Sequence, residues 1–234
     1  FYKSTYSFTD ENRDYVSNNI TLLIFFNFLM TGLVIAFAKP ILLILNPIYE
    51  DAYFILILLA IGNFFSVLTN VFIQSLTGSE IIDKNKKSTF KQYLHSKLFY
   101  PHTLRLVQTS ASLIILPIGL ILLIQNNYSE INLLQFWAAL LLVTQIPLAF
   151  YLYLTTKNTI TLSINRKTIL KYLVASLISF SLIFIISEQF LIYDELISFI
   201  PKLLLFAVIG TSFYLFLTYI LDSNTRFLFK SIIS

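Results

Sequence analysis

The feature that most constrains this chain is a run of 26 residues without a charged side chain, from Ala52 to Thr77. As a helix rising about 1.5 Å per residue, this run can cross the hydrocarbon core of a bilayer, which is about 30 Å thick. Similar apolar runs recur along the chain, and only 12% of its residues are charged, whereas a soluble domain carries about 25%. The sequence therefore predicts an all-α fold, a polytopic transmembrane helical bundle.

We expect six membrane spans within residues 20–221, preceded by a polar cytoplasmic segment (1–19) and followed by a cytoplasmic tail (222–234). The predicted spans are residues 20–45, 52–77, 103–124, 131–155, 169–187 and 198–221. Lys39-Pro40 interrupts the first span, and a proline inside a helix favours a kink or a break. Asn46-Pro47 predicts a tight turn before the second span.

The distribution of basic residues predicts the orientation of the bundle. If both ends lie in the cytoplasm, only Lys39 and Lys202 of the 16 lysines and arginines fall at the outer side, which leaves 14 at the inner side. Such an asymmetry is typical of cytoplasmic loops. We therefore expect a multi-pass protein of the cytoplasmic membrane with its N- and C-termini inside. The basic connection at 78–100 fits either a helix lying among the lipid headgroups or a solvated loop.

The second span carries polar side chains along one face. Asn63, Ser66, Asn70, Gln74 and Thr77 recur at spacings of three and four, so they form one stripe, and the opposite face is apolar. A side-chain amide that faces lipid is unfavourable. The stripe therefore either hydrogen-bonds to neighbouring helices or lines a wet cavity that accepts a solute.

Residues suited to catalysis or to metal binding are few. The two histidines, His95 and His102, have no accompanying carboxylate pair, the chain has no cysteine, and its five glycines form no phosphate-binding loop. We expect no catalytic residue, no metal and no cofactor, and hence no enzyme. Nucleic acid is not an expected partner either, because the basic residues lie between the apolar runs.

Charged groups are also scarce inside the predicted spans. None of the six contains Asp or Glu, although a proton or sodium relay normally needs one. Arg105, near the inner end of the third span, shares a face with Gln108, Thr109 and Ser112. Its guanidinium either extends to the inner membrane surface or binds a phosphate, because the guanidinium matches phosphate oxygens in geometry.

Several segments resemble a known family. They are Lys39-Pro40-Ile41-Leu42, Tyr49 and Ala52 at the start of the second span, Leu76-Thr77-Gly78 at its end, Leu116-Pro117-Ile118-Gly119, and the Trp137 span with QIPLAFYLYL followed by KYLVASLISF. Together they resemble the second half of archaeal Wzx-like polysaccharide flippases, in the multidrug/oligosaccharidyl-lipid/polysaccharide superfamily. Leu116 to Gly119 is similar to the Pro-x-Gly turn of that family.

The resemblance implies one half of a two-bundle flippase fold, in which two six-helix bundles face a central cavity. The chain opens at Phe1 rather than Met, so we expect a fragment whose partners are the missing N-terminal bundle, membrane lipids and a lipid-linked glycan substrate. Flipping of lipid-linked oligosaccharide or polysaccharide precursors would proceed by alternating access. The candidate cavity residues are Asn27, Asn63, Ser66, Asn70, Gln74, Arg105 and Gln108.

Three other functions remain open at this point. A membrane glycosyltransferase or ligase would need acids in the loops, such as Asp194 and Glu195. A drug/cation antiporter of the same superfamily would need an intramembrane carboxylate in the missing half. A scaffold subunit would use the stripe of the second span as a protein–protein contact.

The predicted orientation can be tested by labelling cysteines introduced one at a time, because the chain has none of its own. Cysteines at Lys87, Ser163 and Ser231 should resist an impermeant thiol reagent in intact cells, because the membrane shields them. Cysteines at Asn127 and Asp194 should react. Labelling at position 87 from outside would refute the orientation.

Overall fold

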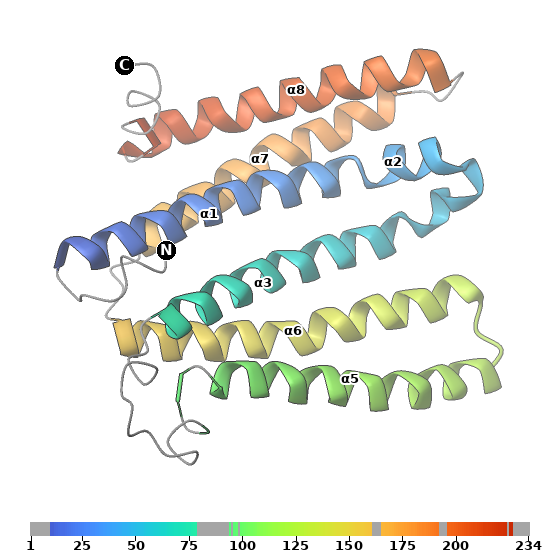
Figure 1. Cartoon of the computed structure of the whole chain (residues 1–234). Coiled ribbons are helices and arrows are strands. Elements are labelled where there is room, and N and C mark those ends of the chain that lie inside the picture. Colours follow the sequence, from blue (N-terminus) through green and yellow to red (C-terminus); the bar gives the residue numbers. More distant parts are fainter. Residues whose placement is uncertain are drawn as a thin grey trace. The chain divides into compact units, whose positions relative to one another are not determined.

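The computed structural model describes residues 10–78, 94, 96–97, 99–160, 165–191, 196–223 and 225–226. All the regular structure in these residues is helical (Figure 1). The helices are α1 (Asp10–Ala36), α2 (Ala38–Leu45), the short 3-10 helix η1 (Pro47–Ala52), α3 (Tyr53–Gly78), α5 (Tyr100–Gln125), α6 (Glu130–Ile160), α7 (Arg166–Phe190) and α8 (Leu196–Leu221). The predicted all-α fold is confirmed.

Among the described residues, six segments are long and apolar enough to cross a membrane. They are Val16–Ala36, Pro47–Gly78, Tyr100–Gln125, Glu130–Ile160, Arg166–Phe190 and Leu196–Leu221. Each corresponds to one predicted span, so the chain is a multi-pass membrane protein. The basic connection at 79–93 lies outside the described residues, as do His95, Asp194 and Glu195.

The first predicted span differs most from the structure. Helix α1 begins at Asp10 rather than Ile20, and it ends at Ala36. Pro40 lacks the N–H group that would bond to the carbonyl of Ala36, so the helix breaks at Phe37, as the proline predicts. Helix α2 then starts with Pro40 in its first turn, where that donor is not needed. In contrast, α5 continues through Pro117 and Gly119, which lie inside the predicted third span.

The corner between α2 and α3 is built from local hydrogen bonds. Asn46 is extended, and its side chain accepts the N–H of Ile48 at 3.0 Å, with Pro47 opening η1. The predicted turn at Asn46-Pro47 is therefore confirmed. Lys39 pairs with Glu50 across this corner at 2.8 Å, and the hydrogen bond to Glu50 raises the pKa of Lys39. Both side chains are more than one third exposed, so the pair contributes at most about 1 kcal/mol.

The chain divides into two compact units. The first comprises Phe1–Leu23 and Ile61–Ile164, and the second comprises Ile24–Ala60 and Asn165–Ser234. The first unit therefore holds α5, α6 and most of α3, and the second holds α2, η1, α7 and α8, while α1 is divided between them after Leu23. The sequence predicts one bundle of six spans, because helical periodicity identifies the faces of a helix and not the helices that those faces pack against.

In the first unit, α5 and α6 form an antiparallel hairpin beside α3 (Figure 1). The turn after α5 places Asn127 in the left-handed region, with φ of 57°. Tyr128 N–H bonds to Leu123 O at 3.2 Å, and Asn127 N–H to Ile124 O at 3.0 Å. This pattern is a Schellman motif, which satisfies the last carbonyls of the helix. Apolar side chains then join α3 to α6, namely Phe72, Ile73 and Leu76 with Leu148 and Leu152.

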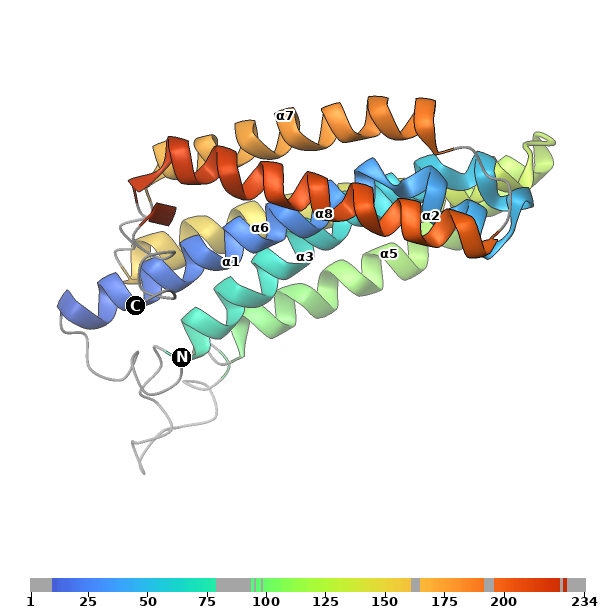
Figure 2. The same cartoon turned by 90° about the horizontal axis from the view of Figure 1, so that it is seen from above.

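In the second unit, α7 and α8 form another hairpin, whose two helices lie side by side in Figure 2, and side chains of both contact α1. The Phe25 ring lies 5.3 Å from the rings of both Tyr172 and Tyr214, measured between centroids. Tyr214 donates to the carbonyl of Phe25 at 3.0 Å, and Ser176 donates to that of Phe28 at 3.2 Å. Two side-chain donors therefore fasten α1 to its neighbours through the backbone of α1.

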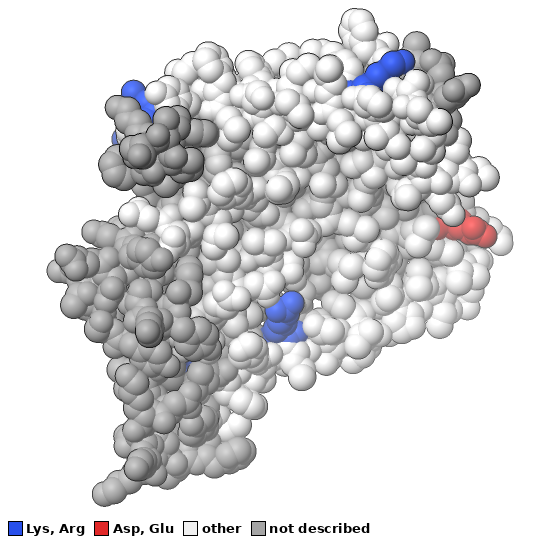
Figure 3. Space-filling model, turned by 45° about the horizontal axis from the view of Figure 1, so that its top comes forward, with Lys and Arg blue, Asp and Glu red and all other residues white. Residues whose placement is uncertain are grey.

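The outer surface of these helices is apolar. On α5, Leu106 and Leu113 are both 66% exposed, and Ile114 is 64% exposed. Lysine, arginine and acidic residues are few on the face that Figure 3 shows. So large an apolar surface is unfavourable in water and favourable against lipid, where the helical hydrogen bonds satisfy the backbone.

We expect Gly32 to be intolerant of any side chain. A Cβ atom at Gly32 would overlap the Phe180 ring of α7, including the ring carbon nearest its backbone. Overpacking of this kind typically costs about 1–3 kcal/mol, which exceeds the gain of roughly 1 kcal/mol in helix propensity from Gly to Ala. Gly32→Ala should therefore lower the melting temperature of the purified protein, and Gly32→Ala/Phe180→Leu should restore much of it.

The matched control is Gly62→Ala. A Cβ atom there lies 3.9 Å from the nearest backbone atom of Leu142, an ordinary contact. This variant should melt at or above the temperature of the wild type, because it gains helix propensity without overlap. Equal melting temperatures for Gly32→Ala and Gly62→Ala would contradict the proposed α1–α7 contact.

Candidate functional site

The polar stripe of α3 lies on the face that its own unit leaves open. Asn63 and Gln74 are exposed, and Ser66, Asn70 and Thr77 are half-buried. The opposite face is the packed one, where Phe72 is 3% exposed against α6. No described side chain hydrogen-bonds to Asn63 or Gln74. Helix α3 thus packs through its apolar face and presents amides outward.

Arg105 of α5 lies beside the centre of this stripe. Its guanidinium donates a hydrogen bond to Oδ1 of Asn70 on α3. Asn70 is a neutral partner, and Arg105 pairs with no carboxylate among the described residues. The side chain is exposed and most of its N–H donors are left over, so the guanidinium can hold an anion at the edge of the stripe.

A second polar network joins α3, α5 and α6 in the first unit. Gln145 of α6 donates to Thr69 of α3 at 2.9 Å and accepts from Gln108 of α5, also at 2.9 Å. Thr144 lies next to Gln145 and contacts Gln108 at 3.4 Å and Ser112 at 3.3 Å. Gln108, a candidate cavity residue, therefore bonds to side chains of α6. Hydrogen bonding between helices is one of the two roles that the sequence predicts for the stripe of α3. The structure shows it here, in residues outside that stripe.

Thr69, Thr144 and Gln145 are not among the residues that the sequence predicts for a site. The available signal was Gln145 itself, an amide in the middle of an apolar span, because such a group needs a partner in hydrocarbon. Thr69 lies off the stripe by helical spacing, so periodicity alone gave no reason to select it.

A cavity of about 450 Å³ lies between α5 and α6 next to this network. Its walls are mainly apolar, with Gln108 and Thr144 as polar members and Tyr100 and Tyr151 at one end. The hydroxyls of those two tyrosines are hydrogen-bonded to each other. The cavity therefore offers an apolar chain a surface within reach of two polar groups.

Asn27, also a candidate cavity residue, belongs to the second unit. It lies on α1, where it is only 8% exposed. The structure groups Asn63, Ser66, Asn70, Gln74, Arg105 and Gln108 in the first unit. Asn27 is thus the one candidate of the seven that lies in a different unit from the stripe.

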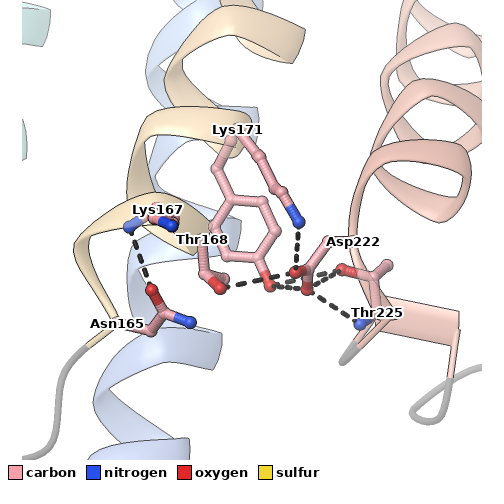
Figure 4. Close-up of polar contacts among 7 residues, drawn as sticks. Asn165, Lys167, Thr168, Lys171, Asp222 and Thr225 are labelled. Carbon is pink, nitrogen blue, oxygen red and sulfur yellow. Dashed lines mark hydrogen bonds and ion pairs between the residues drawn. The ribbon is translucent and has the colours of Figure 1, made fainter.

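The second unit contains a buried carboxylate that the sequence analysis assigned to the tail. Asp222 is 1% exposed and lies directly after α8. As Figure 4 shows, it accepts hydrogen bonds from the start of α7 and from Thr225, which follows α8. The donors are Tyr172 at 3.0 Å, Thr168 at 3.4 Å, and the N–H and hydroxyl of Thr225 at 3.1 and 3.3 Å. The ammonium group of Lys171 lies 3.6 Å away.

This Asp222 network is saturated with partners. Four donors and one cation surround the Asp222 carboxylate. These contacts stabilise its negative charge and connect the start of α7 to the end of α8. Thr168, Lys171 and Tyr172 occupy the first two turns of α7, and an antiparallel hairpin brings those turns beside the end of α8. The arrangement suits a structural anchor and leaves little room for a ligand.

No group of three or more His, Cys, Asp or Glu that could hold a metal occurs in the part of the chain that the structure describes. His102 is exposed on the first turn of α5. No protein-family model, curated protein or solved structure matches this chain. The function is therefore inferred from the geometry of the stripe, of Arg105 and of their neighbours.

Replacing Asp222 should test its role as an anchor. Asp222→Ala leaves Tyr172, Thr168 and the Thr225 N–H without their acceptor, and each buried donor left unsatisfied costs about 1–3 kcal/mol. We expect a large fall in melting temperature and a smaller one for Asp222→Asn, which keeps one carboxamide oxygen. The measurement is thermal unfolding of the purified protein.

The control is Asp51→Ala, since Asp51 is exposed and no described residue bonds to its side chain. A surface substitution of this kind changes stability by about 0.5 kcal/mol or less. If Asp222→Ala melts with the wild type, the Asp222 network does not hold the hairpin.

Proposed function

We propose that this chain is part of a transporter that flips lipid-linked oligosaccharides across the cytoplasmic membrane by alternating access. The open face of α3 and Arg105 of α5 would line the path. One observation carries the proposal: a membrane-spanning helix packs through its apolar face and leaves two amides of its polar stripe, Asn63 and Gln74, exposed. We further propose that both ends of the chain lie in the cytoplasm, as the basic residues predict.

The stripe has the length and chemistry to bind a sugar chain. From Asn63 to Gln74 it extends about 16 Å along the helix axis. Amides can both donate to and accept from hydroxyl groups. Facing lipid, these amides would be unfavourable, and facing a water-filled path they would exchange water for sugar hydroxyls at a net gain of roughly 0.5–1.5 kcal/mol each.

Arg105 would bind the phosphate that links sugar to lipid. A guanidinium matches phosphate oxygens with two parallel N–H donors, and the hydrogen bond to Asn70 fixes its position beside the stripe. A sugar on Asn70 and a phosphate on Arg105 would therefore lie next to each other, as they do in a lipid-linked oligosaccharide. The resemblance to Wzx-like flippases supports the same substrate.

Other functions fit these residues less well. A glycosyltransferase would need an acid at the site, and neither the stripe nor Arg105 has a carboxylate beside it among the described residues. A cation antiporter would need a carboxylate that can release its partner. Asp222 is buried, but it is already bound by Lys171 and by the donors of the Asp222 network.

Substitutions that separate the open amides from the engaged ones test the proposal in the full-length protein. Asn63→Leu/Gln74→Leu removes side chains that bond to no described residue, so stability should hold while flipping falls roughly tenfold or more, as two lost hydrogen bonds predict. The matched control is Gln145→Leu, which breaks the hydrogen bonds to Thr69 and Gln108 and should lower the melting temperature.

Arg105 extends this test. Arg105→Lys keeps the charge but loses the bidentate geometry, and Arg105→Gln loses both, so activity should fall in that order. The measurement is accumulation of lipid-linked oligosaccharide on the cytoplasmic face, normalised to folded protein. Normal flipping by Asn63→Leu/Gln74→Leu and by Arg105→Gln would refute the assignment of the path.

A further inference from the structure

Basic side chains lie close together at the N-terminal end of α7, where cations are unfavourable for a helix. Arg166, Lys167 and Lys171 all lie within its first six residues, and its first turn contains no acid. The N-terminal end of a helix carries a positive partial charge, so anions stabilise it and cations do not. By contrast, Lys157 lies in the last turn of α6, where a cation is favourable.

The Asp222 network adds a fourth cation to the same end of the second unit. Asp222 holds the end of α8 against Thr168 and Tyr172, and the N–H of Arg226 bonds to the carbonyl of Asp222 at 3.3 Å. Asp222 balances Lys171. Arg166, Lys167 and Arg226 are exposed and form no ion pair with a described residue.

After Arg166 along α7, the exposed face of the helix consists of alkyl side chains. Leu170, Val174 and Leu177 follow Arg166 at offsets of four, eight and eleven, so they lie along the same face. Leu170 is 59% exposed, Val174 40% and Leu177 58%. The buried side of the helix is a different one, which carries Thr168 and Tyr172.

We propose that this face of α7 binds an anionic phospholipid. Arg166 and Lys167 hold its phosphate at the helix start, and an acyl chain lies along Leu170 and Leu177. A phospholipid is favoured over a free anion because the cations adjoin exposed alkyl side chains on a membrane-spanning helix. The site lies in the second unit and does not depend on the proposed transport function.

Lipid titration of the full-length protein in nanodiscs tests this proposal. The base lipid is phosphatidylcholine, phosphatidylglycerol is added in steps, and bound lipid is counted by native mass spectrometry. Arg166→Gln/Lys167→Gln should weaken phosphatidylglycerol binding roughly 10- to 30-fold, as the loss of two interfacial basic residues predicts. The matched control is Lys157→Gln/Lys202→Gln, which also removes two exposed cations and should change the affinity less than twofold.

Two further arms identify the ligand. Leu170→Gln/Leu177→Gln should weaken the lipid several-fold, and inorganic phosphate alone should not compete with it at millimolar concentration. Effective competition by phosphate would make this a free-anion site and overturn the proposal, as would an equal loss in the two charge-neutralising variants. If Arg166→Gln/Lys167→Gln fails to fold, the wild type decides: equal affinity for phosphatidylglycerol and phosphatidylcholine overturns the proposal, and a preference for the anionic lipid that the leucine variant weakens supports it.

Discussion

Polar groups in hydrocarbon have no water to bind, and this constraint organises the whole chain. The backbone meets it by forming helices, which satisfy their own N–H and C=O groups. Side chains meet it by pairing. Because lipid tails are as apolar as leucine, burial of apolar surface contributes little to helix association in a membrane, and hydrogen bonds and close packing carry more of it.

Each unit shows this pairing in a different form. In the first unit, Gln145 joins Thr69 and Gln108, so an amide of α6 connects α3 and α5. In the second unit, Asp222 collects donors from α7 and from the residues after α8, while Tyr214 and Ser176 bond to the backbone of α1. The close approach of Gly32 to Phe180 adds packing where α1 offers no side chain.

Two exposed amides of α3 differ from these paired groups. Asn63 and Gln74 lie on the same helix as Thr69, yet Thr69 is bonded to Gln145 and they bond to no described residue. A membrane helix that satisfies one set of polar groups and leaves another exposed is consistent with a polar path along that face. Arg105 strengthens this interpretation, because its partner Asn70 leaves its charge uncompensated.

The sequence by itself determined the elements. Length and hydropathy predicted six spans, Pro40 predicted the break that falls at Phe37, and Asn46-Pro47 predicted the corner before α3, because these effects are local to the backbone. Helical periodicity also placed the five polar residues of α3 on one face. What only the tertiary structure decided was the partner of each polar group: Arg105 for Asn70, Gln145 for Gln108, and the start of α7 for Asp222. Those pairings depend on how far one helix is shifted and rotated against another, and that register arises from packing between segments far apart in the sequence.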